Sequence, residues 1–76
     1  MTDETYAVIL FHSTSYALRA EKVLVQAGIG SKLIPVPRQL SSDCGVCIRI
    51  AQADREAAMD ALGEARVQVE GLHALE

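Results

Sequence analysis

The stretch that decides the fold is KLIPVP, residues 32–37. Its apolar, partly β-branched composition predicts a strand. Pro35 and Pro37 have no backbone N–H, so neither can donate a hydrogen bond to a neighbouring strand. A strand that contains both prolines belongs at the edge of a sheet. Any arrangement of the other elements must therefore leave residues 32–37 with one strand neighbour.

Three further strands are expected around this edge strand. YAVILFH, residues 6–12, is a short apolar run of the kind typical of a central strand. In residues 46–51, Val46, Ile48 and Ile50 alternate with Cys47, Arg49 and Ala51, which predicts a half-buried strand. Residues 67–75 predict a last strand, bulged at Gly71.

Two helices are expected between these strands. Ser13, Thr14 and Ser15 can cap the first helix, whose apolar stripe consists of Tyr16, Ala20, Val23, Leu24 and Ala27. Gly28 should end it in a left-handed conformation, with Ile29 folding back on Leu24. Asp54 is expected to cap the second helix, with Ala58, Ala61, Leu62 and Ala65 on its inner face.

The predicted order is βαββαβ, which short connections and right-handed crossovers restrict to few arrangements. We expect an α+β, ferredoxin-like fold: a four-stranded antiparallel sheet of order 4-1-3-2 with two helices on one face. Residues 32–37 then lie at an edge, as the prolines require. Residues 1–76 form a single domain. The other face of the sheet is left bare, which predicts a homodimer or a protein partner covering it.

Composition excludes several classes of function. The chain has 76 residues and a net charge of −3, and its seven Lys and Arg are scattered singly. No basic stripe is present, so nucleic acid is not expected as a partner. The start, MTDETYAVILF, is acidic where a signal peptide is basic, and its apolar run is too short to span a membrane. We expect a cytoplasmic protein with no membrane association.

The predicted topology places a candidate site at one end of the sheet. The turn after the first strand and the loop between the second and third strands should lie together there, which brings Cys44 near the start of the first helix. Backbone N–H groups and the helix dipole favour an anion at that position and lower the pKa of a thiol. Asp43, beside Cys44, works against thiolate formation.

Cys44 and Cys47 have the spacing C-x-x-C, which raises three alternatives: a redox pair, half of a metal site, or one working thiol. In an extended chain their Cα atoms would be about 10 Å apart, whereas a disulfide needs less than about 7 Å. Two thiolates supply only half of a zinc shell; His12 could add a ligand, and His73 should lie elsewhere. We expect Cys47 to be a small packing residue and Cys44 an accessible thiol.

Two segments resemble a known family. FHSTSYALRAEKVL, from Phe11, and LIPVPRQLSSDCG, ending at Gly45, are similar to the selenium/sulfur carrier protein-like proteins, a group of small bacterial and archaeal proteins. The similarity covers almost the whole chain and includes the closing Glu70-Gly71-Leu72. In the family the position of Cys47 usually holds a plain apolar residue, and this chain departs from that pattern.

The resemblance implies a carrier, not a stand-alone enzyme. Cys44 would accept sulfur or selenium as a persulfide or perselenide and pass it to a partner protein, with a cysteine desulfurase as a donor. No metal or other cofactor is expected. The residues expected to surround Cys44 are His12, Ser13, Thr14, Arg38, Ser41, Ser42 and Gly45. The alternatives are a non-catalytic module that binds a small anion or a protein, and a metal-handling domain.

Overall fold

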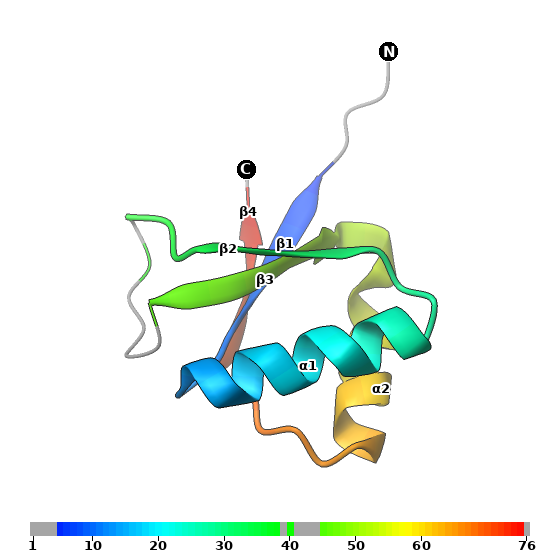
Figure 1. The fold of residues 1–76 in the computed structure, drawn as a ribbon. Helices are drawn as coiled ribbons and strands as arrows, with labels where there is room; N and C mark the ends of the chain where they lie inside the picture. Colours follow the sequence, from blue (N-terminus) through cyan, green and yellow to red (C-terminus); the bar gives the residue numbers. More distant parts are fainter. Residues whose placement is uncertain (1–4, 39, 41–44, 76) are drawn as a thin grey trace.

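The chain folds into one sheet with two helices packed against it (Figure 1). The computed structural model describes residues 5–38, 40 and 45–75. The strands are β1 (Tyr6–Leu10), β2 (Ser31–Pro35), β3 (Val46–Ala51) and β4 (Gly71–Leu75). The helices are α1 (Thr14–Gln26) and α2 (Arg55–Glu64), the latter preceded by a 3-10 turn, Gln52–Asp54.

The four strands are ordered β2-β3-β1-β4, and every neighbouring pair is antiparallel. This is the predicted order, stated from the opposite edge. β2 pairs only with β3, so the strand that carries Pro35 is at an edge, as its missing N–H requires. The α+β class, the four-stranded sheet and the strand order are therefore confirmed.

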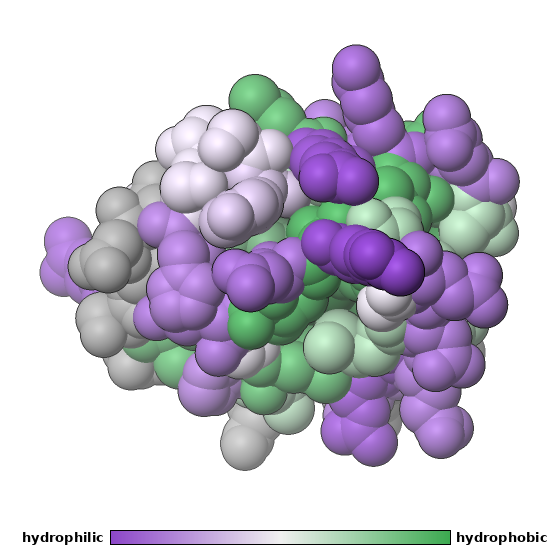
Figure 2. Space-filling view, turned by 90° about the horizontal axis from the view of Figure 1, so that it is seen from below, coloured by the Kyte–Doolittle hydropathy of each residue, from purple (hydrophilic) through white to green (hydrophobic). Residues whose placement is uncertain are grey.

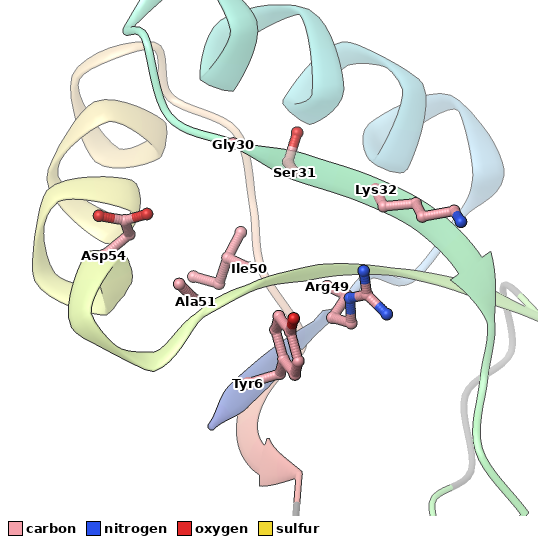
Figure 3. A pocket seen from close by; sticks show the side chains of 8 residues that line it. All are labelled: Tyr6, Gly30, Ser31, Lys32, Arg49, Ile50, Ala51 and Asp54. Atoms are coloured by element: carbon pink, nitrogen blue, oxygen red, sulfur yellow. The ribbon is translucent and has the colours of Figure 1, made fainter. Parts of the chain in front are cut away.

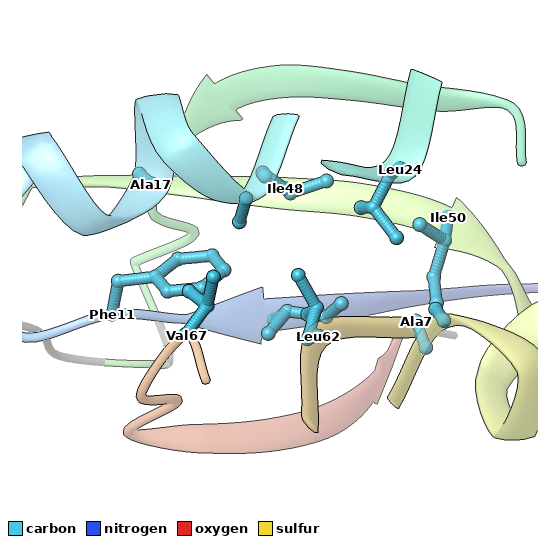
Figure 4. Packing of buried hydrophobic residues seen from close by; sticks show 11 residues of the cluster. Ala7, Phe11, Ala17, Leu24, Ile48, Ile50, Leu62 and Val67 are labelled. Carbon is cyan, nitrogen blue, oxygen red and sulfur yellow. The ribbon is translucent and has the colours of Figure 1, made fainter. Parts of the chain in front are cut away.

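Both helices cover the same face of the sheet, and the main core lies between them and β1 and β3 (Figure 4). Alternate residues of the two central strands point into this core, because successive side chains of a strand face opposite sides. The predicted inner residues Ala58 and Leu62 of α2 are fully buried. The buried members of the cluster are Ala7, Ile9, Phe11, Ala17, Ala20, Leu24, Ile48, Ile50, Ala58, Leu62 and Val67.

The ends of α1 follow the sequence closely. Ser13 is the N-cap, and its hydroxyl accepts a hydrogen bond from the Tyr16 N–H at 3.4 Å. At the other end Gly28 has φ 75°, the Gly28 N–H donates to the Val25 carbonyl, and the Ile29 N–H donates to the Leu24 carbonyl. This pair of bonds is a Schellman motif. The predicted glycine stop, with Ile29 folded back on Leu24, is confirmed.

The second helix ends in the same motif without a glycine. The Arg66 N–H donates to the Gly63 carbonyl and the Val67 N–H donates to the Leu62 carbonyl, with Arg66 at φ 59°. An arginine in this left-handed conformation is strained, because its Cβ approaches the following carbonyl. Asp54 is at the N-cap of α2 as predicted, but its side chain makes no capping hydrogen bond.

The last strand is shorter than the sequence predicted. Residues 67–75 were expected to form it, and only Gly71–Leu75 do. The motif that ends α2 directs Val67 into the helix-side core, where it is 6% exposed. The chain reaches β1 at Glu70, whose N–H donates a hydrogen bond to the Leu10 carbonyl at 2.7 Å. The expected strands over residues 6–12 and 32–37 also end earlier, at Leu10 and Pro35.

The face without helices is not bare. Val8, Leu10 and Cys47 point to this face and form a second buried cluster. Residues of the chain itself pack over them: Ile34, Val36, Leu40 and Leu75. The expectation that this face presents an uncovered apolar surface is therefore wrong for its centre, because the segment after β2 covers it. Formation of a homodimer stays a prediction.

Charged and polar side chains occupy much of the opposite surface, the side on which the helices lie (Figure 2). Apolar side chains appear between them, and the large exposed ones of the described chain are Tyr16, Leu18 and Val25, all on α1. No helix in the described ranges is long and apolar enough to cross a membrane.

Candidate functional site

The sheet register brings the segments of the predicted site to one end of the molecule. Leu10, the last residue of β1, pairs with Cys47 near the start of β3, and Val46 pairs with Pro35 at the end of β2. The turn from β1 into α1 and the segments flanking the β2–β3 loop therefore lie at the same end of the sheet. This arrangement is the one that the strand order predicted.

The start of α1 offers backbone donors and hydroxyl groups at this end. Ser13 and Ser15 place their Oγ atoms 3.0 Å apart, and Thr14 and Ser15 are exposed. The first turn of α1 carries no acidic side chain. The positive end of the helix dipole is therefore not compensated within that turn, which favours an anion beside it.

Three more of the predicted site residues are described. His12 follows β1 and is exposed, and Arg38 is exposed two residues beyond the Val36 that helps to cover the helix-free face. Gly45 has φ 80°, and its carbonyl accepts a hydrogen bond from the Val36 N–H at 3.3 Å. That bond closes the base of the β2–β3 loop and needs a left-handed residue at position 45.

The predicted residues Cys44, Ser41 and Ser42 lie outside the described residues. The proposed role of Cys44 consequently rests on the sequence and on the positions of the segments around it. No group of three His, Cys, Asp or Glu in residues 5–38, 40 and 45–75 could hold a metal ion. Since Cys44 is not among those residues, a metal site that includes it stays an untested alternative.

Cys47 is a packing residue, as the sequence predicted. Its side chain is fully buried, and its Sγ–H points to the Pro35 carbonyl at 3.9 Å. It contributes to the small cluster with Val8 and Leu10. A thiolate in this position would lose its hydration, so the structure favours the neutral, apolar role of Cys47 over a reactive one.

Comparison with known proteins identifies the family. A profile of the family described as "Putative Se/S carrier protein-like" matches residues 6–74. The chain belongs to this family. The matched range includes the whole described sheet except Leu75, both helices and the β2–β3 loop. The Se/S carrier resemblance of the two sequence segments is therefore confirmed over nearly the full chain.

A curated relative of this Se/S carrier-like protein has no assigned function. "Uncharacterized protein YtiA" of Escherichia coli (strain K12) is 39% identical over 41 residues. The aligned stretch covers 54% of this chain and 48% of YtiA, so the match spans about half the length of each protein. No solved structure matches the chain.

The contact between Arg49 and Tyr6 is not predictable from the sequence. Arg49 is only partly exposed and lies over the Tyr6 ring, 4.4 Å from the ring centroid. Tyr6 begins β1, so this pair lies at the end of the sheet away from the start of α1. The period-2 alternation of β3 places Arg49 on the helix-free face, but nothing in the sequence indicates the register that brings Tyr6 beside it.

Proposed function

We propose that the protein is a carrier of sulfur or selenium that holds the atom on Cys44 and passes it to a partner protein. Family membership over residues 6–74 is the observation that carries the proposal. A second support is the register of the sheet, since Arg38 and Gly45, which flank Cys44 in sequence, lie at the end where α1 begins. We also infer that the βαββαβ order is the ferredoxin-like fold.

The transfer is a displacement at the terminal chalcogen atom. The Cys44 thiolate attacks the outer sulfur of a donor cysteine persulfide, the donor S–S bond breaks, and the donor cysteine leaves as a thiolate. Cys44 then carries the persulfide, and no external oxidant is consumed. A donor perselenide reacts in the same way through its selenium atom. Delivery is the reverse process, with a nucleophile of the acceptor attacking the outer atom and the Cys44 thiolate leaving.

The surroundings proposed for Cys44 suit such an intermediate. A persulfide is more acidic than a thiol and is an anion near neutral pH. The N-terminus of α1, with its hydroxyl groups and without an acidic residue in the first turn, would stabilise this charge. Arg38 adds a cation at the same end. The donor class that supplies a cysteine persulfide is a cysteine desulfurase.

The test is intact-mass analysis of protein purified without reductant, before and after incubation with a cysteine desulfurase and cysteine. We expect an adduct of one sulfur mass on the wild-type protein and on Cys47→Ala, and no adduct on Cys44→Ser. Replacing cysteine by selenocysteine in the same reaction distinguishes selenium from sulfur. Cys44→Ser is expected to change the free energy of unfolding by no more than about 0.5 kcal/mol, the usual range for surface substitutions.

Three results would contradict the proposal. An adduct that persists on Cys44→Ser and moves to Cys47 would show that the wrong thiol was chosen. A large fall in the melting temperature of Cys44→Ser would show that Cys44 belongs to the core. Absence of any adduct, together with zinc in native mass spectra, would favour the metal-handling alternative.

A further inference from the structure

A pocket of 390 Å³ lies at the other end of the sheet from the candidate sulfur site (Figure 3). It is formed where β2 begins, β3 ends and the chain turns into α2. Its volume is within the range of about 300–1,000 Å³ that is typical of small-molecule sites. The lining residues are Tyr6, Gly30, Ser31, Lys32, Arg49, Ile50, Ala51 and Asp54.

Two cations share one side of this pocket. Lys32 of β2 and Arg49 of β3 are register partners, so their side chains start from directly opposed positions on the helix-free face. Like charges directly across a strand pair repel each other. Within the described chain neither side chain forms an ion pair, so no protein carboxylate offsets this repulsion. A bound anionic group would offset it.

The Arg49 guanidinium is available to such a group. Its central carbon lies 4.4 Å from the centroid of the Tyr6 ring, a cation–π contact. Within the described chain the guanidinium makes no hydrogen bond, so its N–H donors are available to a ligand. These donors form the planar fork that matches a carboxylate. The contact with Tyr6 therefore favours one position of Arg49 without using its N–H donors.

Two more groups of the pocket lack a hydrogen-bond partner in the described structure. The Ser31 Oγ is buried and makes no hydrogen bond. Asp54 makes no capping bond to α2, and it lines the opposite side of the pocket from Lys32 and Arg49, as Figure 3 shows. A simple anion would satisfy the two cations and be repelled by the Asp54 carboxylate. A simple cation would be attracted by Asp54 and repelled by Lys32 and Arg49.

We propose that this pocket binds a small zwitterion, a metabolite with a carboxylate at one end and an amine at the other. The carboxylate lies between Lys32 and Arg49, and the amine faces Asp54. Tyr6 contributes apolar surface to the short chain that joins the charged groups. This site is separate from Cys44, so it does not depend on the proposed sulfur transfer.

The experiment is a titration followed by two-dimensional amide NMR spectra. The probes are glycine, β-alanine and γ-aminobutyrate, in which the separation of amine and carboxylate increases stepwise. Butyrate and butylamine are the matched compounds that keep one charged end only. We expect saturable shifts of the pocket amides with at least one zwitterion, and weaker binding of both single-charge compounds.

Variants assign the two ends of the ligand. Arg49→Gln should weaken binding of the best zwitterion about tenfold or more, the usual effect of losing a hydrogen bond to a charged group. Asp54→Asn should weaken binding of the zwitterion but not of butyrate, and asparagine is as good an N-cap as aspartate for α2. Lys22→Gln, which removes an exposed cation on α1, should change nothing.

The proposal is overturned by any of three results. The first is shifts that rise linearly without saturation for all three zwitterions. The second is butyrate binding as tightly as the best zwitterion in the wild-type protein, which would leave Asp54 without a role. The third is an equal loss of binding in Lys22→Gln and Arg49→Gln while the spectra of both variants remain those of the folded protein.

Discussion

The two faces of the sheet are built differently. On the helix side, β1 and β3 pack against two helices, and the cluster includes the large side chains Phe11, Ile9 and Leu24. On the other side, within the described residues, three buried side chains are covered by partly buried side chains of the strands and of the segment after β2. The helix side therefore supplies most of the buried apolar contacts. The thinner side leaves room for Lys32, Arg49 and His73 to reach solvent.

The largest expected effect is on the helix side. Leu24→Ala should lower the free energy of unfolding by about 3 kcal/mol, because Leu24 of α1 is fully buried in the helix-side core and the surrounding side chains cannot collapse fully into the cavity. Urea denaturation measures this change through the midpoint. A loss below about 1 kcal/mol would mean that α1 adjusts freely, contrary to the packing described here.

The same substitution on the other face should cost less. Leu10 is 3% exposed, and Leu10→Ala is expected to lower the free energy of unfolding by about 2 kcal/mol, the low end for buried leucines, because the cover formed by Val36 and Leu40 can move inward. The two variants are compared by urea denaturation in the same buffer. Equal losses would show that the two faces are equally rigid.

Gly45→Ala tests how the cover is attached. An added Cβ meets no atom within 4 Å, so the cost is the left-handed backbone alone, about 1 kcal/mol. Gly30→Ala is the matched control, since its Cβ also meets open space and its φ is not in the left-handed range. In a Cys44→Ser background, Gly45→Ala should also speed alkylation of Cys47, because the Val36–Gly45 bond holds the cover. Unchanged alkylation would show that the cover is held elsewhere.

The smallest effect is expected for Arg49→Gln. Its contact with Tyr6 is partly exposed, so its removal should lower the free energy of unfolding by only about 0.5 kcal/mol. Thermal unfolding of the variant and of Lys32→Gln provides the measurement. Lys32→Gln should raise the stability slightly, because it removes the repulsion between Lys32 and Arg49 and keeps the Tyr6 contact. A loss of several kcal/mol would show that this face contributes more to stability than its thin cover indicates.

Local chemistry made the order of the strands predictable. Pro35 and Pro37 require an edge, and only one arrangement of the remaining strands provides it without crossed connections. Gly28 also predicted the end of α1, because a left-handed residue at that position is usually a glycine. Both features depend on a backbone property of single residues, and that property can be read directly from the residue type.

Features that depend on tertiary packing were not predictable. Arg66, after α2, takes the left-handed conformation that Gly28 takes after α1, and the arginine residue type does not predict this conformation. The burial of the next residue, Val67, stabilises Arg66 in this conformation. The sheet face without helices was expected to be bare, whereas Val36 and Leu40 pack over the cluster that contains Cys47. For the candidate site, the positions of His12, Ser13 and Arg38 followed from topology, and the Tyr6–Arg49 contact did not.

The proline at the end of β2 also affects the solubility of the protein. An edge strand with unpaired N–H and C=O groups can recruit strands from other molecules and start aggregation. Pro35 offers no N–H at the outer edge of β2, and Pro37 removes another just beyond it. Growth of the sheet by strand addition is therefore discouraged on this side. A second copy that adds to the sheet would have to use β4, the edge that contains no proline.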